Sequence, residues 1–111
     1  MFRTFIQTQE FSRKWDNLGL NDDDLRLLEL DIINNMDKYP RIRGTGGLQK
    51  ARMPLENKGK SGGARVCFAD FAFAETTYLI TIYGKKDNLS KEERNAIRKA
   101  MDFLKKSLGG K

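Results

Sequence analysis

Two glycine-rich segments in the middle of the chain leave room for only one short regular element between them. They are residues 44–47 (GTGG) and 59–63 (GKSGG). We predict a β-strand over residues 48–53 (LQKARM), in which alternate side chains share a face. One face of this strand would carry Leu48, Lys50 and Arg52, and the other Gln49, Ala51 and Met53. Because glycine lets backbone amides approach a phosphate closely, the two segments are suited to flank an anion site.

Positive charge is concentrated in the same region. Residues 41–65 hold seven lysines and arginines and one glutamate, which gives a local charge of +6. The net charge of the whole 111-residue chain is also +6, because the preceding residues sum to −3 and the following residues to +3. Cations placed side by side on a strand repel each other, so an anionic partner is a physical reason for the cluster. The alternative is a solvated edge strand whose lysines oppose aggregation.

The first part of the chain predicts a strand and two helices. Residues 2–7 (FRTFIQ) have the β-branched and aromatic content of a short strand. Thr8 is placed to cap a first helix and Asn21 a second. The three aspartates at positions 22–24 fall in the first turn of the second helix, where the helix dipole favours carboxylates. Consecutive positions point around a helix, so we interpret these aspartates as capping residues rather than metal ligands.

The second half predicts two more strands and a last helix. Residues 64–71 and 77–83 have strand-like composition, and residues 72–76 would join them as a hairpin connection. The strand over residues 77–83 is apolar on both faces, as expected in the middle of a sheet. Ser90 and Glu93 form a capping box that opens the last helix. This order predicts an α+β fold, a small antiparallel sheet flanked by two N-terminal helices and a C-terminal helix.

Length and composition are those of one globular domain over residues 1–111. The single cysteine, Cys67, cannot form an internal disulfide, so nothing indicates secretion. The sequence has no signal-peptide pattern and no apolar run of about 18 residues. We therefore expect no membrane contact and a cytoplasmic location.

The absence of histidine narrows the chemistry that the chain can perform. It removes the two-histidine route to RNA cleavage, nucleophile triads that need an imidazole, and most zinc sites. Cys67 lies between Val66 and Phe68 in a predicted strand and is interpreted as a buried structural thiol. Neither glycine segment matches a nucleotide-binding motif. We expect neither a metal nor a cofactor.

A purely cationic site can still cleave RNA. The 2′-hydroxyl of the substrate supplies the nucleophile, so the protein needs only to orient it and to stabilise the charge of the phosphorane. A lysine crowded by other cations has a lowered pKa and is suited to act as a general base, and an arginine can clamp a non-bridging oxygen with two hydrogen bonds. Spacing alone does not separate such an enzyme from a binder of nucleic-acid backbone. The basic segment lacks interleaved aromatic residues, so a base-stacking platform is not predicted in it.

Three motifs together resemble one protein family. They are G-T-G-G-L-x-K-x-R from Gly44, G-K-x-G-G-x-R-V from Gly59 and Y-L-I-T-I-Y-G-K-K from Tyr78. Over residues 2 to about 107 the chain resembles the RelE superfamily of toxins of bacterial type II toxin–antitoxin systems, closest to the HigB/RelE-like branch often found in prophages. The resemblance implies ribosome-dependent cleavage of mRNA in the decoding site, leaving a 2′,3′-cyclic phosphate and a 5′-hydroxyl. It also implies three partners: the ribosome, mRNA and a cognate antitoxin with a helix-turn-helix DNA-binding domain.

The resemblance assigns roles to individual cations. It implies that Lys50 or Arg52 acts as the base, that Arg65 clamps the transition state, and that Lys86 lies near the leaving group. A second set is implied to bind ribosomal or messenger RNA: Lys58, Lys60, Lys85 and Arg43. Some family members place a tyrosine or histidine near the C-terminus, and no such residue follows Lys86 here. Tyr83, the nearest tyrosine, is interpreted as a packing residue.

Two other kinds of function are compatible with the pattern. One is a non-catalytic toxin of the related ParE type, which poisons gyrase on the same fold. The other is a basic nucleic-acid-binding or structural protein of a phage or of the ribosome. Cuts within translated codons after brief expression would favour the nuclease, whereas DNA damage with intact mRNA would favour the ParE type.

Overall fold

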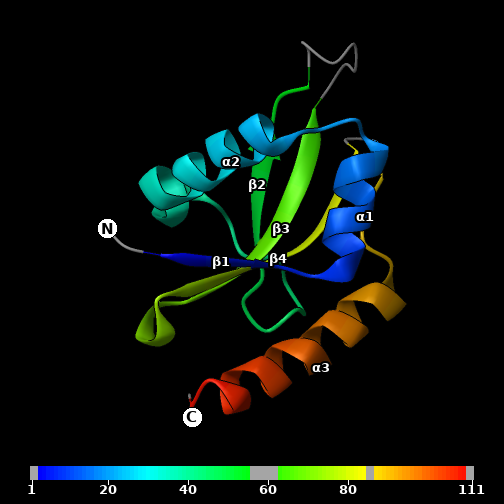
Figure 1. Cartoon of the computed structure of the whole chain (residues 1–111). Coiled ribbons are helices and arrows are strands. Elements are labelled where there is room, and N and C mark those ends of the chain that lie inside the picture. Colours follow the sequence, from blue (N-terminus) through cyan, green and yellow to red (C-terminus); the bar gives the residue numbers. More distant parts are fainter. Residues whose placement is uncertain (1–2, 56–62, 85–86, 110–111) are drawn as a thin grey trace.

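The computed structural model of the chain describes residues 3–55, 63–84 and 87–109 and has an α+β architecture (Figure 1). Its helices are α1 (Gln9–Asn17), α2 (Asp22–Asn35) and α3 (Lys91–Ser107), with short 3-10 turns at Met36–Lys38 and Ala72–Ala74. Its strands are β1 (Thr4–Gln7), β2 (Gln49–Met53), β3 (Ala64–Phe71) and β4 (Thr76–Gly84). The predicted order of elements is confirmed.

The four strands form one sheet in the order β1-β4-β3-β2. β2, β3 and β4 are antiparallel neighbours, as predicted, and β1 adds to β4 in parallel, so the complete sheet is mixed. β4 lies between β1 and β3, which explains why its sequence is apolar on both faces. The β3–β4 register shifts between Cys67 and Phe68, which pair with Thr81 and Leu79 and leave Ile80 as the extra residue of a bulge.

Local hydrogen bonds fix where the helices begin. The Thr8 hydroxyl accepts from the backbone N–H of Phe11 at 3.0 Å, which caps α1. Asn21 and Asp24 exchange two side chain–backbone hydrogen bonds of 2.9 Å at the start of α2. The predicted capping role of this acidic turn is confirmed. Ser90 and Glu93 form the corresponding box at the start of α3, with distances of 3.0 and 3.1 Å.

The two faces of the sheet carry separate hydrophobic cores. On one face, residues of α1 and α2 pack against Ala51, Val66, Leu79 and Ile82. On the other, residues of α3 pack against Leu48, Cys67, Ala69 and Phe71. Leu48 and Ala51 thus lie on opposite faces, as the alternation in residues 48–53 predicts. α1 has only nine residues and would be marginal alone, so it depends on its buried aromatic residues, Phe11 and Trp15.

Gly63 sets the junction between β2 and β3. Its φ is +70°, and a Cβ at this position would lie 2.5 Å from the carbonyl oxygen of Met53. Any other residue would therefore push the two strands apart. This close approach fixes the pairing of Met53 with Ala64, and with it the pairing of Arg52 with Arg65.

None of the helices in the described ranges has both the length and the apolar character needed to cross a bilayer.

Candidate active site

The strand register brings three of the predicted cations together. Arg52 on β2 lies directly opposite Arg65 on β3, and Lys50 lies two residues before Arg52 on the same face. Directly opposite residues in an antiparallel pair have their Cβ atoms about 5 Å apart. On the next strand, Tyr83 lies opposite Arg65. Lys50, Arg52, Arg65 and Tyr83 therefore form one continuous patch, which we call the cationic face.

The cationic face lies at the end of the sheet where water reaches the side chains. Arg52 is exposed, and Lys50, Arg65 and Tyr83 are partly buried. In Figure 1, β2 and β3 extend beyond α3 at this end. The other end of the same face is closed by Met101 of α3, which is 3% exposed. Positive side chains thus occupy the part of the face that stays solvated.

Cys67 lies beneath this patch as a structural group. It is directly opposite Lys50 and fully buried. Burial raises the pKa of the Cys67 thiol to about 12, although the charges of Lys50 and Lys14 lower it. The thiol is therefore protonated near neutral pH and is not a nucleophile. The prediction of a buried structural cysteine is confirmed.

Tyr83 packs against the core and holds its hydroxyl beside the cations. Burial, followed by its interaction with Cys67, raises the pKa of Tyr83 to about 12, whereas the nearby Arg65 and Arg94 lower it. The predicted packing role is confirmed. The same contacts place a phenol that keeps its proton next to Arg65, where it is a fixed hydrogen-bonding group.

Two further cations reach this region from helices and were not predicted as site residues. Lys14 of α1 donates from Nζ to the Thr81 hydroxyl at 3.3 Å and pairs with Glu10 at 3.5 Å. Arg94, in the first turn of α3, has a buried Nε with no hydrogen-bond partner among the described residues. In the sequence, Lys14 reads as half of an ordinary i, i+4 pair on a helix surface. For Arg94 the only signal is its place one residue after the capping box.

Acidic side chains limit where an anion can lie. A cavity of about 260 Å³ between α1, the end of β4 and the start of α3 is lined by Lys14, Tyr83, Asp87, Asn88, Leu89 and Glu93. The backbone N–H of Ser90, which donates to Glu93, lowers the pKa of that carboxyl, so the acid stays charged. Two carboxylates oppose a phosphate in this cavity. The β2–β3 side of the cationic face is therefore the better anion site.

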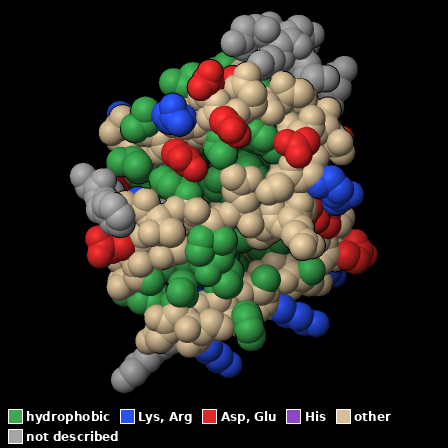
Figure 2. Space-filling view, in the orientation of Figure 1, with side chains coloured by type: hydrophobic (Ala, Val, Ile, Leu, Met, Phe, Trp, Pro, Cys, Tyr) green, Lys and Arg blue, Asp and Glu red, His purple; other side chains and the backbone are tan. Residues whose placement is uncertain are grey.

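The surface on the other side of Arg52 is acidic and apolar. A cavity of about 620 Å³ beside α2 is lined by Asp24, Leu27, Leu28, Asp31, Arg52, Met53 and Pro54. Figure 2 shows acidic side chains among hydrophobic ones in this part of the molecule. α2 carries five carboxylates against Arg26 as its one cation. A nucleic-acid backbone is repelled from this surface, and Arg52 stands at the boundary between the two regions.

Of the remaining predicted site residues, Arg43 alone lies within the described ranges, and it does not join the cationic face. Arg43 is exposed in the turn before β2, towards the end of the strand that pairs with Phe68, and is therefore away from Arg65. Lys58, Lys60, Lys85 and Lys86 lie outside the described residues. Within the described ranges, no three side chains that commonly bind metal ions come together.

No protein-family model matches the sequence, so the interpretation of the site depends on its own chemistry.

Proposed function

We propose that the chain is a metal-independent endoribonuclease that cleaves mRNA on the ribosome, as the toxin of a type II toxin–antitoxin system. The observation that carries this proposal is the pairing of Arg52 with Arg65 across β2 and β3, with Lys50 next on the same face. Three positive side chains on one small solvated patch suit the two non-bridging oxygens of a phosphodiester and the charge that develops on them. The motifs that resemble the RelE superfamily support the same activity.

The proposed reaction uses the substrate as its own nucleophile. The 2′-hydroxyl gives its proton to the base as its oxygen forms a bond to the adjacent phosphorus. The bond from phosphorus to the 5′-oxygen breaks, and this oxygen takes up a proton, so the products carry a 2′,3′-cyclic phosphate and a 5′-hydroxyl. Lys50 is a better base than Arg52, because a guanidinium does not release its proton in a protein. Arg65 stabilises the phosphorane, and the family resemblance implies that Lys86, which lies outside the described residues, acts at the leaving oxygen.

The direct test is cleavage of mRNA by the purified chain on programmed ribosomes, mapped by primer extension. We expect cuts within translated codons, no effect of a chelator, and no cut where the nucleotide before the scissile phosphate carries a 2′-O-methyl group. Lys50→Gln should abolish most cleavage, whereas Arg13→Gln, which removes an exposed cation of α1, should not. Cleavage of the 2′-O-methyl substrate would contradict the mechanism, and DNA damage with intact mRNA would favour a ParE-type toxin.

The same proposal includes a cytoplasmic location and neutralisation by a helix-turn-helix antitoxin. Co-expression of a neighbouring gene for such a protein should restore growth and yield a stable complex. Growth arrest that this protein does not relieve would contradict the assignment to a toxin–antitoxin pair.

A further inference from the structure

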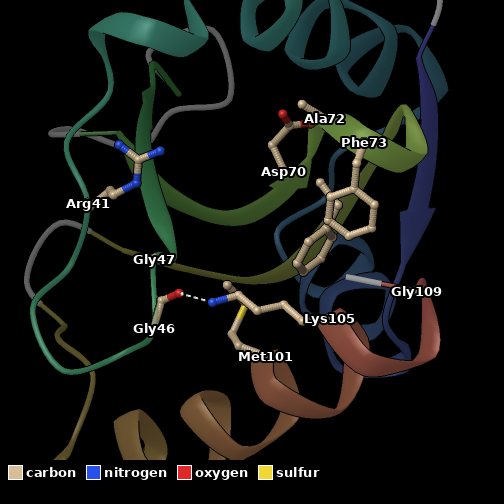
Figure 3. A pocket seen from close by; sticks show the side chains of 10 residues that line it. Arg41, Gly46, Gly47, Asp70, Ala72, Phe73, Met101, Lys105 and Gly109 are labelled. Carbon is tan, nitrogen blue, oxygen red and sulfur yellow. Dashed lines mark hydrogen bonds between the residues drawn. The ribbon is translucent and has the colours of Figure 1, made fainter. Parts of the chain in front are cut away.

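A second large cavity lies near the C-terminal end of α3 (Figure 3). Its volume is about 650 Å³, within the range of sites that hold a small molecule or a nucleotide. It is bounded by the turn before β2, the 3-10 turn Ala72–Ala74 and the last turns of α3. The residues that decide its chemistry are Arg41, Phe73, Met101 and Lys105.

Phe73 gives the cavity an accessible aromatic ring. Its side chain is 58% exposed although it is apolar. It contacts the buried Phe71 ring edge-on, with centroids 6.0 Å apart and an angle of 65° between the ring planes. Phe71 thereby holds the Phe73 ring in place and leaves part of it free. Stacking of a nucleobase on such a ring contributes about 1–3 kcal/mol.

Two cations border the same cavity. Lys105 donates from Nζ to the carbonyl oxygen of Gly46 at 3.2 Å, which ties the turn to α3 (Figure 3). Arg41 makes no side-chain hydrogen bond or ion pair with the described residues and is available to an anion. Asp70 also lines the cavity, but Arg3 pairs with it at 3.4 Å and the Thr77 hydroxyl donates to it at 2.7 Å. These contacts compensate its charge, so the cavity has an aromatic wall and a net positive border.

The cavity lies next to the beginning of β2, which carries the cationic face. Arg41 forms a β-bridge with Gln49, and the backbone N–H of Lys50 donates to the carbonyl of Pro40 at 3.0 Å. Residues directly opposite each other in an antiparallel pair share a face, so Arg41 lies on the side of Gln49, the opposite side from Lys50 and Arg52. The cavity is therefore a site separate from the cationic face.

We propose that this cavity binds one unpaired nucleotide of an RNA strand, with its base on Phe73 and its phosphate between Arg41 and Lys105. The choice of RNA as the ligand rests on the proposed function, whereas the cavity and its contacts do not. A stacked base must be out of a duplex, so the cavity selects single-stranded RNA. Stacking on an aromatic ring accepts any base, so we expect a weak base preference.

Binding of a short single-stranded 2′-O-methyl RNA, followed by fluorescence anisotropy, tests the cavity without cleavage. We expect Phe73→Ala to weaken binding about 5- to 150-fold, the equivalent of roughly 1–3 kcal/mol, and Phe73→Trp to retain it. Phe103→Ala is the matched control, because Phe103 is 69% exposed on α3 and does not line the cavity. Equal effects of Phe73→Ala and Phe103→Ala would overturn the proposal. Melting temperatures should show that all three variants are folded.

Abasic substitution along the RNA locates the bound base. An abasic site at one position of the RNA should lower its affinity for the wild-type chain. The same abasic site should not lower the affinity for Phe73→Ala, because the stacking partner is already absent. Arg41→Gln should weaken binding at every position and flatten its salt dependence. If the abasic effect persists in Phe73→Ala, the base lies elsewhere and the proposal is wrong.

Cleavage measurements separate this proposal from the proposed function. The cleavage rate is measured over a range of concentrations of mRNA-loaded ribosomes. Phe73→Ala should raise the concentration that gives half the maximal rate and leave the maximal rate unchanged. Phe73-dependent binding without any cleavage by the wild type would retain the nucleotide site and overturn the nuclease. If the wild type cleaves mRNA and Phe73→Ala changes neither cleavage nor RNA affinity, the nuclease is retained and the nucleotide site is overturned.

Discussion

The face of the sheet towards α3 has two halves that use the same strands in opposite ways. In the covered half, Leu48 and Ala69 are fully buried and contribute to a core with Met101 of α3. In the solvated half, the alternate positions of the same strands hold Lys50, Arg52 and Arg65. A charge beneath α3 would lose its hydration without a partner, whereas a charge beyond α3 keeps it. The limit of the covering helix thus decides which positions can carry cations.

Placing a charge in the covered half, or an apolar side chain in the solvated half, should have the largest effect on stability and activity. Leu48→Lys places a cation in the covered half, where losing hydration costs several kcal/mol and the lost leucine burial adds about 2 kcal/mol. This sum is comparable with the whole stability of a small domain, so we expect loss of cooperative unfolding in thermal denaturation. Lys50→Leu makes the converse change in the solvated half and should leave a folded chain without cleavage activity. A folded, stable Leu48→Lys variant would show that the covered half is not dry.

Removing the central cation of the solvated half should affect the reaction rather than folding. Arg65→Ala is expected to lower the cleavage rate by about two to three orders of magnitude, because a donor aimed at a developing oxyanion contributes roughly 3–4 kcal/mol. Arg65→Lys should recover part of the rate, since it keeps the charge and loses the planar pair of donors. The measurements are single-turnover cleavage and urea unfolding. An unfolded Arg65→Ala chain would identify Arg65 as a structural residue.

The pH dependence of stability should be the smallest effect and confined to alkaline solution. The pKa of Cys67 rises from 9.0 to about 12 and that of Tyr83 from 10.0 to about 12 in the folded chain. When folding raises the pKa of an acid that is neutral while protonated, the group contributes stability to the folded state. This contribution is fully present below the pKa of the unfolded chain and is lost as pH rises towards the pKa of the folded chain. Stability should therefore be flat near pH 7 and fall between about pH 9 and pH 12. Cys67→Ala should make this fall shallower in urea unfolding at several pH values, and an unchanged fall would contradict the assignment.

The sequence predicts the parts of the fold that depend on neighbouring residues. The caps at Thr8, Asn21 and Ser90 are hydrogen bonds over three residues, and the strand faces follow from a period of two. The parallel pairing of β1 with β4 joins distant parts of the chain, so no local pattern carries it. The 3-10 turn in the predicted hairpin connection is also missed, and with it the exposure of Phe73.

The candidate site also has a part that local sequence predicts and a part that depends on contacts between distant residues. The common face of Lys50 and Arg52 follows from the strand period alone. Their alignment with Arg65 depends on the register that Gly63 permits at Met53, which requires the contact between two strands. Lys14 and Arg94 reach the region through the packing of α1 and α3, and helix packing leaves no signature in the spacing of charges along the chain.

The pairing of β1 with β4 also sets when the cationic face can be completed during synthesis of the chain. Both β1 and α1 contact β4, which a ribosome makes long after them. Until β4 has left the exit tunnel, Phe11 and Trp15 have no complete sheet to pack against. The nascent chain therefore cannot finish folding before that point. For a chain proposed to attack translating ribosomes, this late folding delays the complete cationic face until β4 has been made and has left the exit tunnel.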